Sequence, residues 1–393
     1  MTATPTAASS PRLDSIDLVR GLVMALMALD HTRDYFHSLS LQGVDPLDLA
    51  RTTPALYFTR WITHFCAPLF SFLAGTGVFL SAARGRPKGE LSWFLVTRGL
   101  WLIVLEFTFV RWAWLFSWDL SGNWGLVLWA LGWSMIVLAA LVHLPVWAVT
   151  AFGVVLIAGH NALDGIAPAS FGAWAWLWQV LHVPGGFKLG PDFTFLAYYS
   201  LVPWVGVMAA GYGFGAIFKQ QPAARRSWLL RLGLGLTLGF VALRWSNLYG
   251  DPGPWKPQAT GVQTLYSFFD CEKYPPSLCY LLMTLGPGLL LLAVLDRSVP
   301  GWLKPMVVFG RVPFFYYVLH IPLIHGLAYV MNMVRHGQGN YLAFGEAAPA
   351  GVGVSLLLTY CAWAAVVAGL YPLCQWFAAL KQRHRDLAWL SYF

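Results

Sequence analysis

The sequence predicts an all-α fold: a polytopic membrane helix bundle of about ten transmembrane helices, with both termini in the cytoplasm. Hydrophobic residues make up 58% of the 393 residues, and charged residues make up only 11%. A soluble domain usually carries about 25% charged residues. The mean hydropathy is +0.59, and apolar runs recur along the whole chain. We therefore expect a single membrane domain.

A helix needs about 20 mostly apolar residues to cross the hydrocarbon core of a bilayer. The stretch 171–182, FGAWAWLWQVLH, is Trp-rich and too short for this, so we expect an interfacial or re-entrant helix; if it spans, the helices number eleven. Residues 1–14 are predicted to be a disordered tail, 15–380 one transmembrane domain and 381–393 a cytoplasmic tail. The predicted spans are 15–37, 58–83, 91–116, 123–143, 145–160, 194–218, 228–248, 277–296, 306–333 and 351–380.

The orientation follows from Lys and Arg, which are enriched in cytoplasmic loops. With the N-terminus inside, the inner segments carry twice as many of these residues as the longer outer loops, so both termini are predicted to be cytoplasmic. The inner residues are Arg12, Arg84, Arg86, Lys88, Lys219, Arg225, Arg226, Arg297, Lys304, Lys381, Arg383 and Arg385. The outer residues are Arg51, Arg60, Lys188, Lys256, Lys273 and Arg335.

The net charge of +8 raises the question of nucleic-acid binding. The basic residues lie in short gaps between apolar runs, however, which is the pattern of membrane topology. We therefore expect the lipid bilayer as a partner and no nucleic acid. The five Cys residues include no CxxC pair, so no zinc site or redox motif is indicated and no metal is expected.

The first predicted helix holds the densest group of ionisable residues, in the segment DHTRDYFH at 30–37. Ionisable groups within hydrocarbon are costly and are therefore functional candidates. Asp30, Asp34 and His37 share one stripe of a helix. His31 and Asp34 are i, i+3 neighbours, so the carboxylate could orient the imidazole. The alternative is that this segment is only the solvated outer end of the helix. His31, however, lies roughly 22 Å from Ile16 along the helix axis, which places it in the outer third of the hydrocarbon core.

The second and third predicted helices add further ionisable residues. Arg60 and His64 enter from the same outer face, and the small residues that follow include Gly75 and Gly77. These glycines would let a backbone or an acyl chain approach closely. Glu106 lies mid-membrane on the third helix, where a structural ion pair and a role with the substrate are equal alternatives.

The ninth predicted helix starts near Arg311 and carries His320 and His325 on either side of Pro322. A buried His bonded to a neighbour is the common case, but two in one interrupted segment make a functional role an equal alternative.

The eighth predicted helix is preceded by FFDCEKYPPSLCYLL at 268–282. Its residues Lys273, Tyr274 and Ser277 lie at a Pro-rich helix start. They either cap the helix or reach a substrate at the membrane surface.

Four segments make the sequence recognisable, namely SIDLVRGLVMALMALDH (15–31), APLFSFLAGTG (67–77), KYPPSLCYLLMTLGPG (273–288) and GRVPFFYYVLHIPLIH (310–325). They resemble bacterial membrane proteins of the heparan-alpha-glucosaminide N-acetyltransferase catalytic-domain family, and the likeness covers most of the chain. The wider group of transmembrane acyltransferases shares a first-helix pattern D-x-x-R-G followed ten residues later by His. Here the pattern is Asp17, Arg20, Gly21 and His31.

The resemblance implies an acyltransferase of the bacterial inner membrane. It would move an acyl group, acetyl in the simplest case, from cytoplasmic acetyl-CoA or another acyl-CoA to a glycan or lipid-linked saccharide at the periplasmic face. The His of the shared pattern is the catalytic base or acyl carrier in the wider group, so His31 inherits that role. The lysosomal enzyme has its proposed active His after the first helix, which leaves His37 and His64 as alternatives. The expected catalytic set is His31, Asp30, Asp34, His37 and His64.

Two further sets complete the expected site. Cytoplasmic basic residues would bind the CoA phosphates, and polar residues of the outer half would bind the acceptor. The expected CoA-binding residues are Arg84, Arg86, Lys88, Arg98 and Arg311. The expected substrate-binding residues are Arg33, Arg60, Lys273, Tyr274, His320, His325 and Glu106. The sequence leaves open whether the protein forms a homodimer.

Two other functions fit parts of the pattern. A proton-coupled small-molecule transporter also uses intramembrane Asp, Glu and His and helices interrupted by Gly or Pro, but no repeat relates the two halves of the sequence. A haem-binding electron carrier would need His pairs that face each other on adjacent helices, and the spacing of the histidines does not predict such pairs.

Overall fold

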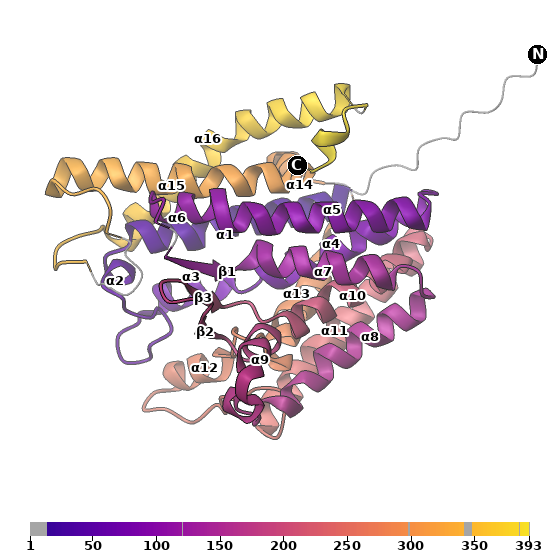
Figure 1. The fold of residues 1–393 in the computed structure, drawn as a ribbon, viewed down its shortest axis with the longest axis horizontal. Coiled ribbons are helices and arrows are strands. Elements are labelled where there is room, and N and C mark those ends of the chain that lie inside the picture. The colour runs from indigo at the N-terminus through magenta and orange to yellow at the C-terminus, as the bar shows by residue number, and fades with distance from the viewer. Residues whose placement is uncertain (1–13, 120, 298, 342–347, 385, 393) are drawn as a thin grey trace, which may run out of the picture.

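The computed structural model describes residues 14–119, 121–297, 299–341, 348–384 and 386–392. The described part is predominantly helical, with one small three-stranded sheet (Figure 1), so the predicted all-α class holds for most of it. Of the predicted tail 1–14, all but Asp14 lies outside the described residues. The elements are α1 (Asp14–Phe36), α2 (Ser38–Leu41), α3 (Pro54–Thr63), α4 (Cys66–Ala83), α5 (Lys88–Leu105), η1 (Glu106–Val110), α6 (Arg111–Leu115), β1 (Gly122–Gly125), α7 (Val127–Leu141), α8 (Val146–Gly159), η2 (His160–Leu163), η3 (Pro168–Trp174), α9 (Ala175–Leu181), β2 (Gly185–Lys188), β3 (Thr194–Ala197), α10 (Leu201–Phe214), η4 (Gly215–Lys219), α11 (Pro222–Ser246), α12 (Gly261–Phe269), α13 (Leu278–Leu295), η5 (Gly301–Leu303), α14 (Lys304–Arg311), α15 (Pro313–His336), α16 (Leu356–Arg383) and η6 (Ala388–Tyr392).

Eight helical stretches of the described residues are long and apolar enough to cross a membrane. They correspond to eight of the predicted spans, so the chain is a multi-pass membrane protein. The two remaining predicted spans are α1, which carries six charged residues, and α7, which has 15 residues. The total of about ten spans and the cytoplasmic termini remain predictions.

Three stretches differ in detail from the expected helices. The predicted span 194–218 opens with β3, because this strand pairs in parallel with β1 and antiparallel with β2. The predicted span 306–333 is broken at Val312, which has φ −133° and ψ 49°, because a residue before proline disfavours the helical conformation. Residues 171–182 form part of η3 and the seven-residue α9, which is too short to span a bilayer.

Helix α1 lies in the centre of the bundle (Figure 1). It packs against α3, α4, α14, α15 and α16, and most of its residues are buried. The backbones of α1 and α14 touch at two glycines. A Cβ on Gly21 would lie 1.7 Å from the carbonyl oxygen of Met306, and a Cβ on Gly310 would lie 1.6 Å from that of Asp17. Small residues at helix contacts allow such an approach, and it fixes the rotation of α1.

We expect Gly310→Ala to lower the midpoint of thermal unfolding of the detergent-solubilised protein. Overpacking typically costs about 1–3 kcal/mol, and here the added carbon meets a backbone oxygen that cannot move alone. Gly326→Ala on α15 is the matched control, because its Cβ would meet nothing within 4 Å and alanine favours a helix by about 1 kcal/mol. Equal unfolding midpoints for the two variants would contradict the close contact of α1 and α14.

Candidate active site

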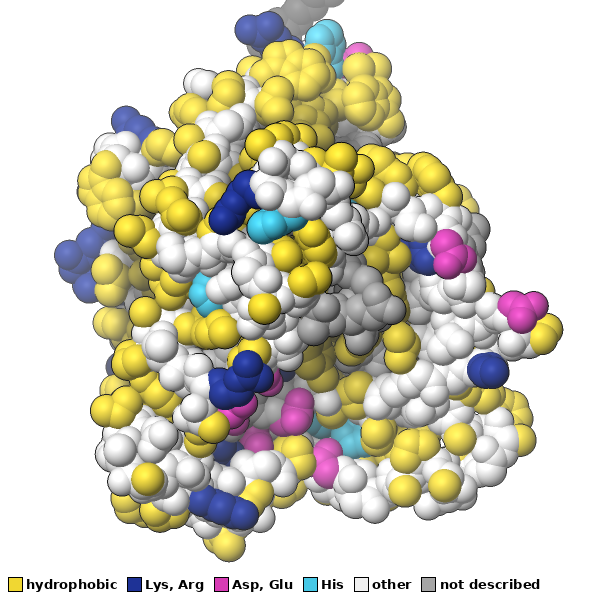
Figure 2. Space-filling model, turned by 90° about the vertical axis from the view of Figure 1, so that its left-hand side faces the viewer, with side chains coloured by type: hydrophobic (Ala, Val, Ile, Leu, Met, Phe, Trp, Pro, Cys, Tyr) yellow, Lys and Arg dark blue, Asp and Glu magenta, His cyan; other side chains and the backbone are white. Residues whose placement is uncertain are grey.

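A cavity of about 840 Å³ lies at the C-terminal end of α1, here called the His31 end. Its walls come from segments that are far apart in the sequence, including α1, α3, α7, α15 and the segment before α13. Figure 2 shows the face that carries α2, where basic, acidic and His side chains lie around a hollow. Seven residues predicted for the site line the cavity, namely Asp30, His31, Arg33, Asp34, Arg60, Lys273 and Tyr274.

The imidazoles of His31 and His320 are hydrogen-bonded across α1 and α15. Nδ1 of His31 lies 2.8 Å from Nε2 of His320, and the two rings are stacked. Nδ1 of His320 lies 2.6 Å from the carbonyl oxygen of Tyr317. A carbonyl oxygen only accepts, so Nδ1 of His320 carries a hydrogen, and Nε2 of the neutral ring must accept from His31. His31 therefore donates through Nδ1, so the lone pair of its neutral ring is on Nε2, and His31 is among the residues that line the cavity.

The ring of His31 is fixed on its other side by Trp114. The two rings meet edge to face with centroids 4.8 Å apart. Tyr35 donates a hydrogen bond of 2.6 Å to the backbone carbonyl of Trp114 and stacks on its ring. His31 is thus held between an aromatic ring and a second imidazole, which suits a base that must act in one orientation.

The charged residues beside His31 form a network of their own. Nη1 of Arg60 lies 2.9 and 2.8 Å from the two carboxylate oxygens of Asp30. Asp30 also forms an ion pair with Nη1 of Arg33 at 2.8 Å. The other Arg33 nitrogen pairs with Asp34 at 2.6 Å. Among the described residues, neither carboxylate is hydrogen-bonded to His31, so the orienting group is His320 and not an Asp, in contrast to the expectation from the sequence. Catalytic roles for Asp30 and Asp34 stay predictions.

The segment before α13 contributes Lys273 and Tyr274 to the cavity. Ser277 caps α13 by accepting a hydrogen bond of 3.0 Å from the N–H of Tyr280, so the capping alternative holds for this residue. Contact of Lys273 and Tyr274 with a substrate stays a prediction. Burial raises the pKa of Tyr274, but the positive charges of Lys273 and Arg60 outweigh it and bring the pKa below its ordinary value. The phenol is therefore a stronger acid, and a stronger hydrogen-bond donor, than an ordinary tyrosine.

Three other predicted histidines do not line this cavity. His37 lies between α1 and α2, and His64 is 1% exposed beside the ring of Tyr280. His325 donates from Nδ1 to the carbonyl of Ala113 at 2.9 Å. These positions favour structural roles over contact with a substrate in the cavity.

Glu106 is also placed away from the cavity lining. Its carboxylate accepts hydrogen bonds from the N–H groups of Leu128, at 2.7 Å, and Trp129, at 3.2 Å. The first N–H groups of a helix have no partner within the helix, so this carboxylate completes the start of α7. Since Val127 of the same turn lines the cavity, Glu106 positions one of its walls.

A second cavity, of about 350 Å³, lies at the other end of α1, here called the Arg20 end. Three of the five residues predicted to bind CoA line it, namely Arg84, Arg98 and Arg311. The other two do not: Arg86 lies over the ring of Phe94 at 4.5 Å, and Lys88 donates to a backbone carbonyl at 3.1 Å. The cavity also contains Arg20 and Lys381, which the sequence did not single out for CoA, although Arg20 belongs to the D-x-x-R-G pattern.

The two cavities share walls from α1, α7 and α15. On α7, Val127 lines the first cavity and Leu128 the second. On α15, Tyr317 lines the first and Phe314 the second. Positions three residues apart on a helix are separated by about 4.5 Å along its axis. On these two helices the cavity linings thus come within roughly one helical turn of each other, whereas on α1 they are ten positions apart, at Arg20 and Asp30. We call Val127, Leu128, Phe314 and Tyr317 the collar between the cavities.

The sequence profile described as heparan-alpha-glucosaminide N-acetyltransferase, catalytic, matches residues 12–240, which is more than half of the chain. The chain belongs to this family. Members of the heparan-alpha-glucosaminide N-acetyltransferase family are transmembrane acetyltransferases, so membership indicates a membrane enzyme of the acyltransferase class. The matched region contains His31, Asp30 and Arg60, whereas His320 and Lys273 come from beyond it. No curated protein matches the chain.

The pairing of His31 with His320 is the feature that sequence reasoning missed in this heparan-alpha-glucosaminide N-acetyltransferase family member. His320 was expected to contact substrate, and facing His pairs were not expected. The two imidazoles do face each other, but their nitrogens are bonded directly, which leaves no space for an iron between them. The sequence does show a His in the first and in the ninth predicted helix, but it does not indicate that these two helices are in contact.

Proposed function

We propose that the protein is a membrane-bound acyltransferase that moves an acetyl group from acetyl-CoA to an amine or hydroxyl of a glycan or lipid-linked saccharide. The observation that supports it is the single tautomer of His31, whose free nitrogen is available to a cavity large enough for a sugar unit. Ligand sites typically enclose about 300–1,000 Å³. The acceptor would bind in the cavity at the His31 end, and acetyl-CoA would enter from the Arg20 end.

In the proposed reaction, the acceptor nitrogen or oxygen attacks the carbonyl carbon of the thioester. The new C–N or C–O bond forms, the C–S bond breaks, and the electron pair of that bond leaves with the CoA sulfur. Nε2 of His31 takes the acceptor proton and then delivers it to the CoA thiolate. While Nε2 is protonated, Nδ1 still donates to His320, so the developing imidazolium keeps its hydrogen bond.

The Arg20 end suits the donor because its cavity gathers guanidinium groups. Arg20, Arg84, Arg98 and Arg311 line one space, and arginine binds phosphate oxygens with two parallel hydrogen bonds. We propose that this end faces the cytoplasm, because the loop between α4 and α5, rich in Arg and Lys, adjoins it and such loops are usually cytoplasmic. The acceptor would then come from the periplasmic side of an inner membrane.

The donor assignment predicts different effects for two exposed basic residues, Arg84 in the loop after α4 and Lys88 at the start of α5. Arg84→Gln should raise the KM for acetyl-CoA about tenfold with little change in kcat, since one hydrogen bond to a charged group contributes about 1.5–3 kcal/mol. Lys88→Gln is the control, because Lys88 does not line the cavity. Initial rates of thiol release over a range of acetyl-CoA concentrations measure both constants. Equal KM values for the two variants would place the CoA phosphates elsewhere.

The function itself is tested with purified protein in liposomes, acetyl-CoA labelled in the acetyl group, and glucosamine as an amine-bearing probe acceptor. Saturable binding of acetyl-CoA, release of free CoA and label in the acetylated sugar are the expected results. Protein that does not bind acetyl-CoA, but carries glucosamine into the liposomes without it, would replace the enzyme with a transporter.

A further inference from the structure

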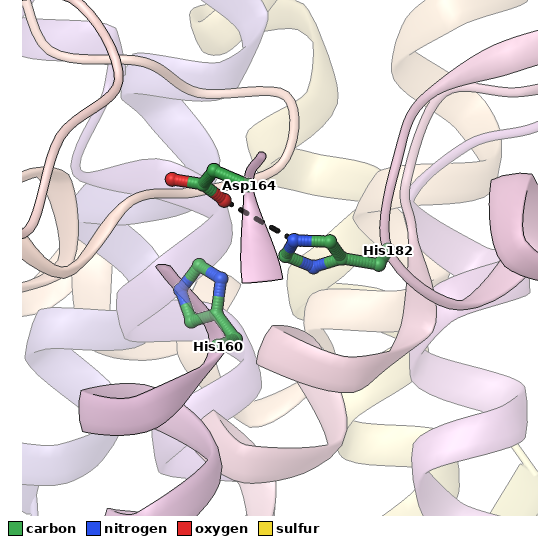
Figure 3. Close-up of side chains that lie close together, drawn as sticks. All are labelled: His160, Asp164 and His182. Atoms are coloured by element: carbon green, nitrogen blue, oxygen red, sulfur yellow. Dashed lines mark hydrogen bonds and ion pairs between the residues drawn. The ribbon is translucent and has the colours of Figure 1, made fainter. Parts of the chain in front are cut away.

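Three potential metal ligands converge outside both cavities. His160 begins η2, Asp164 follows its end, and His182 follows the end of α9. The side chains point toward one another (Figure 3), and their ligand atoms all lie within 4.8 Å of each other. Nothing in the sequence pattern indicated this group, because the two histidines are 22 positions apart and lie at the ends of different helices.

Burial and unused hydrogen-bonding capacity distinguish this group from an ordinary ion pair. His160 is 2% exposed and His182 is 1% exposed. Nε2 of His182 lies 3.1 Å from a carboxylate oxygen of Asp164, but its Nδ1 has no hydrogen-bond partner among the described residues. In the same part of the chain, neither ring nitrogen of His160 makes a hydrogen bond of normal geometry, although the backbone of Pro276 is close to this imidazole. Buried polar groups are nearly always satisfied. The hydrogen bond between His182 and Asp164 accounts for the burial of these two side chains. It does not account for the burial of the imidazole of His160, which points toward them (Figure 3).

We propose that His160, Asp164 and His182 form a binding site for a divalent transition metal of the Zn²⁺ type. Imidazole nitrogen and carboxylate oxygen are ligands that Zn²⁺ accepts, at about 2.0–2.2 Å, usually in a tetrahedron. Three protein ligands leave the fourth position to water or a backbone oxygen. The metal would replace the proton between His182 and Asp164, because an imidazole must be neutral to ligate. The three ligand atoms lie within 4.8 Å of one another, so the side chains would have to rotate toward a common centre to reach these distances.

The surroundings assign this site a structural role. Asp164 also accepts a hydrogen bond of 2.8 Å from the amide of Asn161, which orients the carboxylate as a second layer of contacts does in metal sites. The side-chain oxygen Oδ1 of the same Asn161 accepts a hydrogen bond from the N–H of Leu278 at 2.8 Å. An ion held here would therefore brace the start of α13, just beyond the segment that carries Lys273 and Tyr274 to the active-site cavity.

The test measures metal binding directly and does not depend on acetyl transfer. Protein whose affinity tag has been removed is stripped with a chelator and titrated with ZnCl₂ in competition with a chromophoric chelator. We expect saturation at about one ion per chain and a higher midpoint of thermal unfolding with Zn²⁺, because an ion that binds only the folded state stabilises it. His160→Ala and His182→Ala should each weaken binding at least tenfold and remove the thermal shift.

His143→Ala is the matched control, since His143 is exposed in another loop, and its affinity should equal that of the unaltered protein. Asp164→Asn keeps the shape of the ligand and covers the case in which a His variant fails to fold. The proposal is overturned if the unaltered protein binds no Zn²⁺ at micromolar concentration. It is equally overturned if the double variant His160→Ala/His182→Ala, shown folded by gel filtration, keeps full affinity.

Discussion

Acetyl transfer should fall by about 10²- to 10⁴-fold in His31→Gln, the range typical for loss of a general acid–base group. Glutamine keeps a donor toward His320, so packing is largely retained, but it has no basic nitrogen to accept the proton of the acceptor. The measurement is kcat for label transfer, with acetyl-CoA binding determined in parallel. Binding should stay within twofold, because His31 acts on the acceptor side of the collar.

Three comparisons make the result specific. His37→Gln and His64→Gln should remain active, since neither residue lines the cavity, and His143→Gln reports any general effect of losing a histidine. His320→Gln should reduce kcat less than His31→Gln and shift its pH dependence, because His320 acts only through the imidazole of His31. Normal turnover in His31→Gln would exclude His31 as the base, and a large loss in His64→Gln would transfer the role there.

Loss of the Asp30 carboxylate should destabilise the protein by about 3–5 kcal/mol, the usual cost when one partner of a buried ion pair is removed. In Asp30→Asn, the guanidinium groups of Arg60 and Arg33 lose their shared carboxylate, and Arg33 is 3% exposed. The midpoint of thermal unfolding in detergent is the measurement. Asp192→Asn, at an exposed position, should leave it unchanged.

A double variant tests whether the loss of stability in Asp30→Asn comes from the unpaired positive charge or from altered packing. Asp30→Asn combined with Arg60→Gln removes one charge of each sign and should recover part of the stability lost in Asp30→Asn alone. If the single variant proved as stable as Asp192→Asn, the network around Asp30 would not be a buried one, and the position of α3 against α1 would need revision.

Hydropathy predicted most of the fold because each spanning helix satisfies its own backbone and needs only a long apolar run. Every predicted span contains a helix in the structure. The errors fall where distant segments decide the outcome. Strand β3 replaced the expected start of a helix because Thr194 pairs with Gly122 and with Lys188, and no local pattern specifies such partners.

The site was predictable to the extent that burying charge is costly. That rule selected Asp30, His31, Arg33 and Arg60 before any geometry was known, and the cavity contains all four. It could not show that Asp30 forms ion pairs with Arg33 and Arg60, or that His31 is hydrogen-bonded to His320. The contact between His31 and His320 depends on how α15 crosses α1. The metal expectation rested on Cys spacing alone, which carries no information about His160 and His182.

The collar between the two cavities bears on the leakage of protons and ions across the membrane. An enzyme that works across a bilayer must not leak protons or ions, since each unit charge that crosses 100 mV dissipates about 2.3 kcal/mol. Leu128, Phe314 and Tyr317 are almost fully buried, so under the proposed function these side chains would act as an electrical barrier between the two cavities. An uncharged thioester arm could part these side chains briefly, whereas a hydrated ion could not.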